Sequence, residues 1–246
     1  NLDIWLLGYP DLPTSHPKRV GLILAGNIPM VGFHDVLSTI MSGNIAVTKL
    51  SSKDSVLMNF LRQALIEINT EFEFLWEIVN RLDAIDAIIA TGSNNSSRYF
   101  EYYFSKYPNI IRKNRTSIAV LYGNESDDEI YKLGEDVFNY FGLGCRNVTY
   151  LFLNESFDPI DLFKKWEVFD HLRQHNKYLN NYEYYRSIYL VNKDSHLASD
   201  FLLLKEGDNF FSPIANLEYT TFKDINEVKA RLKEKDDQIQ CIVSKK

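Results

Sequence analysis

This sequence has few cysteines and no long apolar run, and both features limit what the protein can be. Its 246 residues include only two cysteines, Cys145 and Cys241, so no disulfide framework is available and a reducing compartment is indicated. The longest weakly polar stretch, residues 20–33, is too short for a membrane span and is interrupted by Asn27 and Pro29. The sequence also lacks a basic start followed by an apolar core, the pattern of a secretory signal peptide. We therefore expect a cytoplasmic protein with no membrane span.

An excess of basic charge is missing as well. The formal net charge is −6, which argues against binding to nucleic acid through its phosphates. Hydrophobic residues make up 45% of the chain, an ordinary fraction for a globular protein, so the chain can bury a sizeable core. The length is enough for one large domain or two smaller ones.

Several motifs that mark well-known sites are absent. No G-x-G-x-x-G, Walker-type, Gly-x-Ser-x-Gly or C-x-x-C pattern occurs. His171 and His175 are four residues apart on a predicted helix, a spacing that can hold a metal ion, but the catalytic glutamate of zincins is missing between them. We therefore expect a solvated or hydrogen-bonded histidine pair and no metal site.

Predicted strands and helices alternate through the first half of the chain. In order, they are a strand at 19–25, a helix at 30–42, a strand at 45–49, a helix at 55–69, an apolar run at 75–79, a strand at 87–90, a helix ending near 104 and a strand at 110–111. This alternation predicts parallel βαβ units and an α/β fold. The strand-to-helix turns should then share one sheet edge, where such folds bind ligands and helix starts attract phosphate. Small or polar residues occupy three of these turns, at 26–27, 49–52 and 92–93.

The rhythm changes after residue 111, which places the expected domain boundary near residue 116. The second half is predicted to contain, in order, strand 117–122, helix 127–139, strand 148–153, helix 158–178, a tyrosine-rich strand within 182–191, strands 201–204 and 214–219, helix 225–235 and strand 239–243. Cys241 lies in the last of these apolar strand patterns and is expected in the core.

The stretch 140–148 places Cys145 beside two glycines and ahead of an apolar run. Gly142 and Gly144 let the backbone turn tightly and leave room beside the thiol. Arg146 follows directly, and a neighbouring cation favours the thiolate, which is the reactive form. A turn before a strand, with a small residue in the core, explains the same pattern. Cys145 is therefore a candidate nucleophile that needs support from elsewhere in the chain.

Five short motifs, in chain order, are similar to motifs of the aldehyde dehydrogenase superfamily. They are Gly26-Asn27-Ile28-Pro29, similar to its Asn-x-Pro turn; Gly43-Asn44-Ile45-Ala46-Val47-Thr48-Lys49, similar to its Gly-Asn-x-x-x-x-Lys strand; Ala90-Thr91-Gly92-Ser93, similar to Phe-Thr-Gly-Ser; Gly142-Leu143-Gly144-Cys145, similar to Gly-Gln-x-Cys; and Phe211-Ser212-Pro213, similar to Phe-Gly-Pro. Within the superfamily the chain resembles the LuxC-type acyl-CoA reductases, the fatty-acid reductases that supply aldehyde in bacterial bioluminescence. The resemblance runs along nearly the whole chain, and no single motif is decisive.

The resemblance implies a catalytic role for two residues. Cys145 would attack a thioester carbonyl as thiolate. The side-chain amide of Asn27 and the backbone N–H of Cys145 would stabilise the resulting oxyanion. Coenzyme A would leave, and hydride from a nicotinamide would reduce the acyl-cysteine to an aldehyde. Without the resemblance, Asn27 reads as a turn residue before Pro29.

One departure from the superfamily pattern favours reduction over oxidation. Hydrolytic aldehyde dehydrogenases carry a general-base glutamate in a Glu-Leu-Gly-Gly segment ahead of the cysteine. The corresponding region here, residues 110–117, contains no carboxylate. Without a base to activate water, an acyl-cysteine should survive long enough to meet hydride or a thiol.

A second departure concerns the cofactor. The resemblance implies that Lys49 and Ser52 contact the cofactor. After the lysine that matches Lys49, members that prefer NAD often carry a glutamate that bonds the ribose hydroxyls. Ser52 stands in that place and Lys53 follows it. Serine and lysine would accept a 2′-phosphate that a carboxylate would repel, so the resemblance implies NADPH. Asp54 is a nearby carboxylate that weakens this expectation, and simple capping of the next helix by residues 51–54 explains the same pattern.

Further contacts implied by the resemblance are less well supported by the residues. Gly92 and Ser93 stand at a helix start and would lie against the cofactor pyrophosphate. Asn209 replaces the glutamate that binds ribose in the superfamily, which leaves that contact in doubt. The basic run 112–115 is of a kind that is usually solvated, although a phosphate-rich coenzyme A could use it.

We therefore expect an aldehyde dehydrogenase-like α/β protein, truncated at its ends because members of this family usually extend further. Residues 1–116 would form a Rossmann-like nicotinamide-binding domain and residues 117–246 the catalytic domain with the cysteine. The expected activity is NADPH-dependent reduction of an acyl-CoA, or an acyl-protein thioester, to an aldehyde.

Two other readings stay open at this point. The same fold serves aldehyde-oxidising dehydrogenases and glutamyl-phosphate-type reductases. A non-catalytic subunit of an acyl-transfer complex is a different class, because reductases of this type can work with thioesterase and synthetase partners. A homo-oligomer is compatible with all of these readings.

Overall fold

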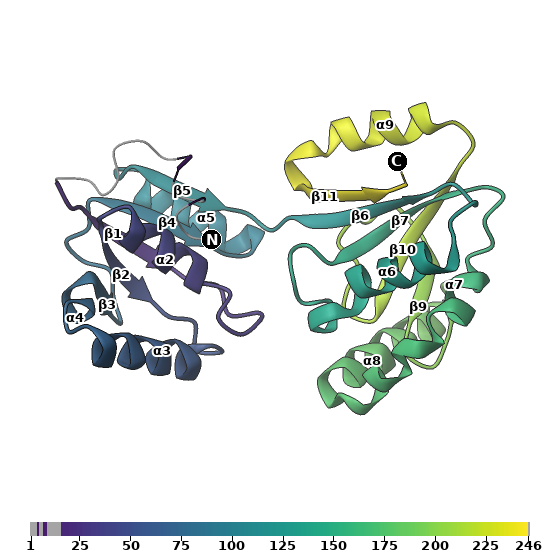
Figure 1. Ribbon diagram of the computed structural model, residues 1–246. Coiled ribbons are helices and arrows are strands. Elements are labelled where there is room, and N and C mark those ends of the chain that lie inside the picture. The colour runs from purple at the N-terminus through teal and green to yellow at the C-terminus, as the bar shows by residue number, and fades with distance from the viewer. Residues whose placement is uncertain (1–3, 5–6, 9–15, 246) are drawn as a thin grey trace. The chain divides into compact units, whose positions relative to one another are not determined.

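The computed structural model describes residues 4, 7, 8 and 16–245, and it divides the chain into two compact units (Figure 1). The first unit ends at Asn114 and the second begins at Arg115. Each unit contains a sheet made mainly of parallel strands, which is the α/β architecture predicted from the alternation of strands and helices. Within the part of the chain that the structure describes, no helix is long and apolar enough to cross a membrane.

The described residues of the first unit form a five-stranded parallel sheet in the order β3-β2-β1-β4-β5. Its strands are β1 (Arg19–Ile23), β2 (Ile45–Lys49), β3 (Trp76–Ile78), β4 (Ala87–Thr91) and β5 (Asn109–Arg112). Its helices are α2 (Phe33–Met41), α3 (Ser55–Ile68), α4 (Phe72–Leu75) and α5 (Asn94–Phe104).

Successive side chains of these strands pack on opposite faces of the sheet. Leu22 of β1 shares a hydrophobic cluster with Val36 of α2 and Met58 of α3. Ile23, the next residue, packs in a second cluster together with Phe100 of α5. Because neighbouring residues of a strand point to opposite faces, an apolar run of this kind is explained by helices on both sides of the sheet.

The second unit contains a six-stranded sheet in the order β11-β6-β7-β10-β9-β8, in which only β8 is antiparallel to its neighbour. Its strands are β6 (Thr116–Leu121), β7 (Val148–Asn154), β8 (Leu197–Ala198), β9 (Leu203–Glu206), β10 (Asn216–Phe222) and β11 (Ile239–Ser244). Its helices are α6 (Asp127–Phe138), α7 (Ile160–Lys165), α8 (Asn176–Asn192) and α9 (Ile225–Glu234), with 3₁₀ turns η1 (Asn139–Gly142), η2 (Glu167–Gln174) and η3 (Asp236–Gln238).

Helices cover both faces of this sheet as well (Figure 1). On the face covered by α6, α7 and α8, Leu151 of β7 lies in the same hydrophobic cluster as Ile130 of α6. On the face covered by α9, Phe152 shares a smaller cluster with Val228. The apolar run of β7 is therefore buried on both sides, as expected of a central parallel strand.

Residues 158–178 do not form the single helix that the sequence predicts. The chain forms α7, bends at Trp166, continues as η2 and begins α8 after His175, whose backbone is extended. The Trp166 indole N–H donates a hydrogen bond to the carbonyl of Ile130 in α6, with an N···O distance of 2.8 Å. Phe169 is buried in the same core. Both rings pack toward α6, and these tertiary contacts accompany a break that the local helix propensity does not predict.

The predicted strand within 182–191 is wrong, because these residues belong to α8. Tyr178, Tyr182 and Tyr189 are buried, and Tyr185 packs against the same core. Their spacing of four, three and four residues places all four rings on one face of a helix. The strand propensity of tyrosine favoured the wrong element, whereas the spacing of the rings contained the correct one.

Helix α2 begins three residues later than the predicted start at Met30. Met30 has a φ of 57°, in the left-handed region, so it belongs to the turn before the helix rather than to the first helical turn. The predicted end is confirmed: α2 stops at Met41 and Gly43 has a φ of 80°, which glycine adopts at little cost.

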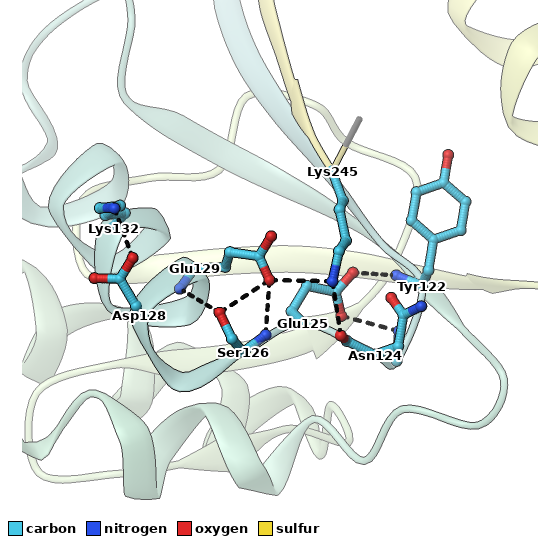
Figure 2. Close-up of polar contacts among 9 residues, drawn as sticks. Tyr122, Asn124, Glu125, Ser126, Asp128, Glu129, Lys132 and Lys245 are labelled. Atoms are coloured by element: carbon cyan, nitrogen blue, oxygen red, sulfur yellow. Dashed lines mark hydrogen bonds and ion pairs between the residues drawn. The ribbon is translucent and has the colours of Figure 1, made fainter.

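A polar network fixes the start of α6 against the end of β11 (Figure 2). Glu125 accepts hydrogen bonds from the amides of residues 122–123, at 2.6 and 2.9 Å. Ser126 and Glu129 form a reciprocal capping box, and Lys245 forms an ion pair with Glu129 at 3.3 Å. The hydrogen bond from the Ser126 amide lowers the pKa of Glu129. The network therefore joins the edge strand of the sheet to the first turn of α6.

We expect Gly134→Ala to destabilise the protein, although alanine is intrinsically the better helix former. A Cβ at Gly134, on the buried face of α6, would lie closer than 3.0 Å to ring atoms of Phe169 and Trp166. Overpacking against rigid rings typically costs about 1–3 kcal/mol, which exceeds the gain in helix propensity of up to about 1 kcal/mol. Urea unfolding measures the effect, with the exposed Lys132→Ala in the same helix as control. Equal or higher stability of Gly134→Ala would contradict this packing.

Candidate active site

Five of the six candidate site residues lie at the carboxyl edge of the first unit's sheet. Asn27 follows β1, Lys49 ends β2 and Ser52 follows it, while Gly92 and Ser93 follow β4. Because β2, β1 and β4 are adjacent and parallel, their ends share one edge, from which α2, α3 and α5 begin. The structure therefore brings the residues of three separate turns to one edge, which is where open α/β sheets bind ligands.

The turn that carries Asn27 is held against the turn that carries Ser52. The Asp54 carboxylate accepts a hydrogen bond from the Met30 amide at 2.7 Å and is only 7% exposed. Gly26 approaches the Ser51 side chain so closely that a Cβ there would overlap it. Asp54 precedes α3, but its side chain makes no capping hydrogen bond, contrary to the predicted capping role. Its partner lies 24 residues earlier in the chain, and no local sequence signal could have revealed it.

The side chains of Lys49, Ser52 and Lys53 are exposed at this edge. Among the described residues, none forms an ion pair with Lys49 or Lys53. The nearest carboxylate in sequence is that of Asp54, which is directed into the Met30 turn. The edge thus offers cations and a hydroxyl, and these groups attract a phosphate.

Gly92 and Ser93 form the start of α5. A Cβ at Gly92 would lie within 3.0 Å of Phe100 and Ser96, so the close packing of α5 on the strand end requires glycine. The Ser93 hydroxyl caps the helix by accepting a hydrogen bond from the Ser96 amide at 3.3 Å. The remaining amides of the first turn of α5 have the orientation that favours an anion.

The basic run after β5 is largely neutralised by neighbouring carboxylates. Arg112 bonds both oxygens of the buried Asp35 at 2.6 and 2.7 Å, and Lys113 pairs with Glu101 at 2.9 Å. Arg112 and Lys113 thus have structural roles, which argues against the run as a phosphate site.

Cys145, the sixth candidate, lies in the second unit, in the turn between η1 and β7. Its side chain is exposed, and the turn is closed by a hydrogen bond from the Asn147 amide to the Gly144 carbonyl at 3.1 Å. No group in the described ranges accepts a hydrogen bond from the Cys145 amide. The thiol and the amide of this residue are therefore both available to a ligand.

The backbone before Cys145 is strained. Tyr140, Phe141 and Gly142 have consecutive φ values of 55°, 57° and 71°. For a non-glycine residue this left-handed conformation typically costs about 1–2 kcal/mol, so the surrounding structure has to hold it. The side chain of Asn147 is buried and bonds backbone groups on both sides of this segment, at Asn139 and Gly144, a role that sequence reasoning missed.

The two histidines that could have suggested a metal ion do not share a helix, and one of them has a structural role. His175 accepts a hydrogen bond from the Tyr178 amide at 3.2 Å, and its ring stacks on Phe141 with 3.9 Å between ring centroids. His171 lies in η2 rather than on the same helix. In the described ranges, no group of three His, Cys, Asp or Glu side chains is placed to hold a metal ion.

Two further residues differ from what the sequence suggested. Asn209 bonds the backbone of Phe211 in both directions, at 3.1 Å each, and so shapes the turn before β10. Cys241 is only partly buried, since β11 is an edge strand, and it is not the core residue that was expected.

Comparison with known proteins identifies relatives of this chain. A family model described as acyl-CoA reductase (LuxC) matches residues 13–169, which is more than half of the chain. The long-chain acyl-protein thioester reductase of Aliivibrio fischeri is 24% identical over 190 residues, which cover 67% of this chain. The chain spans only 40% of the length of that relative.

Solved structures of aldehyde dehydrogenases share the fold. Indole-3-acetaldehyde dehydrogenase from P. syringae superposes with a TM-score of 0.71 at 12% identity, covering 92% of this chain and 60% of that chain. An NAD-dependent aldehyde dehydrogenase from Sinorhizobium meliloti gives 0.66 at 15% identity, with 87% and 52% covered. The glyceraldehyde-3-phosphate dehydrogenase of Methanocaldococcus jannaschii, complexed with NADP, gives 0.64 at 13%, with 93% and 64% covered.

Proposed function

Because this chain belongs to the LuxC family of acyl-CoA reductases and has an aldehyde dehydrogenase-like fold, we propose that it reduces an acyl thioester to an aldehyde with NADPH. The first unit would bind the nicotinamide cofactor, and the second would supply the reacting cysteine. The observation that carries the proposal is Cys145, whose exposed thiol and free amide stand together at the head of a turn.

The first step is acyl transfer to the cysteine. The Cys145 thiolate attacks the thioester carbonyl carbon, and a tetrahedral oxyanion forms. The Cys145 amide and the Asn27 side-chain amide would donate hydrogen bonds to this oxygen. The bond to the coenzyme A sulfur then breaks, coenzyme A leaves as thiolate, and an acyl-cysteine remains.

The second step consumes the acyl-cysteine. NADPH, when bound, supplies the hydride for the carbonyl carbon. The same two amides would stabilise the oxygen as it again gains charge. The carbon–sulfur bond to Cys145 then breaks, the aldehyde leaves, and the cysteine thiolate is restored. The net reaction converts acyl-CoA, NADPH and a proton into aldehyde, coenzyme A and NADP⁺.

The segment that leads into the second unit supports reduction rather than hydrolysis of the acyl-cysteine. Residues 110–117 contain no carboxylate, and the carboxylates that approach this segment are engaged with its cations. Asp35 is buried against Arg112, and Glu101 is paired with Lys113. Among the described residues, Asp35 and Glu101 are thus paired with cations and poorly suited to act as a general base toward water near this segment.

The carboxyl edge of the first unit is compatible with NADPH. Lys49, Ser52 and Lys53 would lie near the adenosine ribose and its 2′-phosphate, and the start of α5 at Ser93 near the pyrophosphate. Asp54, the carboxylate that weakened this expectation, is buried and bonded to the Met30 amide instead.

We expect Ser52→Glu to shift the preference from NADPH toward NADH. The introduced carboxylate would stand beside the 2′-phosphate, and two like charges about 4 Å apart repel by roughly 1–4 kcal/mol near a protein surface. The ratio of kcat/KM for NADPH over NADH should fall at least about tenfold. Ser55→Glu, three residues further along the chain at the start of α3, is the control. An unchanged ratio for Ser52→Glu would place the 2′-phosphate elsewhere.

The proposed activity is tested directly by the products. Purified full-length protein is incubated with a panel of acyl-CoAs and with an acylated carrier protein, each with NADPH and separately with NADH. We expect aldehyde and the free thiol of the acyl donor, coenzyme A or the carrier protein, in equal amounts, with little fatty acid. Free acid as the main product, or efficient oxidation of aldehyde by NAD⁺, would favour an aldehyde-oxidising dehydrogenase. No product and no acylated protein would leave a non-catalytic subunit.

A further inference from the structure

We propose that Asn147 is a positioning residue for Cys145. Its side chain connects the cysteine turn, residues 144–147, to the end of α6 by hydrogen bonds, and so sets the direction of the Cys145 thiol and amide. This inference rests on the proposed function of Cys145 as nucleophile. Asn147 is 6% exposed, and its side chain bonds four backbone groups on both sides of the strained segment.

The donor side of the Asn147 amide holds the end of α6. Its Nδ2 donates to the carbonyls of Asp136 and Asn139, at 2.8 and 2.9 Å, and more weakly to that of Val137 at 3.3 Å. The last carbonyls of a helix have no partner within the helix, and here a buried side chain supplies one. The helix end is thereby tied to a residue two positions beyond the cysteine.

The acceptor side of the same amide holds the residue before the cysteine. The Asn147 Oδ1 accepts a hydrogen bond from the Gly144 amide at 2.7 Å, while the Asn147 backbone amide donates to the Gly144 carbonyl at 3.1 Å. Asn147 thus forms hydrogen bonds with both the N–H and the carbonyl of Gly144. With Gly144 and Asn147 both fixed, little freedom is left to the orientation of Cys145 between them.

A packing constraint supports the same reading. A Cβ at Gly144 would lie 2.9 Å from the Asn147 Oδ1, and Gly144 does not have a positive φ. Glycine is therefore required at this position by the close approach of the Asn147 side chain rather than by backbone conformation. The strained conformation of residues 140–142 has to be maintained by the surrounding structure. Asn147 contributes to this by bonding the carbonyl of Asn139, directly before the strained residues.

Loss of the hydrogen bonds made by the Asn147 side chain should have a specific kinetic effect. A displacement of about 1 Å at a reacting centre can cost roughly a hundredfold in rate. Asn147→Ala should therefore lower the rate of acyl transfer from acyl-CoA to Cys145 about a hundredfold. The affinity for NADPH should stay unchanged, because the proposed cofactor contacts lie in the first unit. Intact-mass kinetics and NADPH fluorescence measure the two quantities separately.

A matched control separates positioning from simple loss of stability. Val228→Ala removes buried atoms on the α9 face of the same sheet, opposite the face of α6. It should lower the melting temperature without slowing acyl transfer. If Asn147→Ala acylates as fast as Val228→Ala, the proposal is wrong.

Two further variants give independent tests, also if Asn147→Ala fails to fold. Gly144→Ala retains Asn147 but places a methyl group against its Oδ1, so acyl transfer in this variant should also slow. Asn147→Asp keeps the acceptor but turns an oxygen toward the helix carbonyls, and protonation would restore one donor. Its rate, divided by that of the wild type at the same pH, should rise as the pH falls.

The outcomes are distinct. Slow acyl transfer in Gly144→Ala, together with the rising ratio for Asn147→Asp, supports the positioning role. Wild-type rates in folded Gly144→Ala, or a ratio for Asn147→Asp that does not change with pH, overturn it while leaving the proposed function intact. Absence of acyl transfer in the wild type would overturn the proposed function, and this role with it.

Discussion

Replacement of Cys145 by serine is expected to lower thioester-dependent NADPH oxidation by about 10⁴-fold or more, to the limit of detection. A serine hydroxyl is a far weaker nucleophile than a thiolate at neutral pH. Serine nucleophiles are activated by an adjacent general base, which the proposed thiolate mechanism does not use. The substitution should not disturb the fold, because the Cys145 side chain is exposed.

The remaining cysteine provides the matched control for this experiment. Cys241 lies on the edge strand β11, partly exposed, and has no place in the proposed chemistry. Cys241→Ser should retain wild-type turnover, and Cys145→Ser should still bind NADPH. Turnover that persists in Cys145→Ser while it is lost in Cys241→Ser would show that Cys145 is not the nucleophile.

Asn27→Ala is expected to slow acyl transfer by about 10²–10³-fold, the usual cost of one oxyanion donor. Asn27 is exposed, and the turn that follows it is held by the hydrogen bond from the Met30 amide to the Asp54 carboxylate. The loss should fall on kcat, with little change in the KM for the thioester, because the amide acts mainly on charge that develops in the transition state.

An exposed asparagine in the same unit controls for nonspecific effects. Asn59 lies on α3, and among the described residues its side chain bonds a carbonyl of its own helix, so Asn59→Ala should leave the rate unchanged. Asn27→Asp is the sharper variant, because it replaces the donor by a carboxylate of nearly the same shape that repels an oxyanion. Equal rates for Asn27→Ala and Asn59→Ala would remove Asn27 from the oxyanion site and leave that task to the Cys145 amide.

Much of the fold could be predicted because its strands follow simple local rules. β1, β2, β4 and β7 are short apolar runs bounded by turn residues, and each was found within two residues of its actual end. The parallel order followed from the alternation with helices. One failure is at Trp166, where the predicted helix breaks and the indole bonds α6. The other is in α8, where the strand propensity of tyrosine was followed instead of the helical spacing of the rings.

The candidate site could be predicted only as far as its individual turns. Asn27, Lys49 and Gly92 were found through short motifs, and the parallel sheet brings their turns to one edge. The residues that hold such turns were not found, because their partners are remote or are backbone groups without a sequence signature. Asp54 reaches back to Met30, and Asn147 bonds backbone carbonyls of α6.

The central claim is that the Cys145 sulfur takes the acyl group from the thioester and holds it until hydride from NADPH reduces it. The most direct measurement is intact-mass analysis after the protein is mixed with an acyl-CoA in the absence of NADPH, followed by peptide mapping and a chase with NADPH. The account predicts one acyl group per chain, located on Cys145, and its release as aldehyde when NADPH is added. An adduct on any other residue, or an acyl group on Cys145 that NADPH does not discharge as aldehyde, would contradict it.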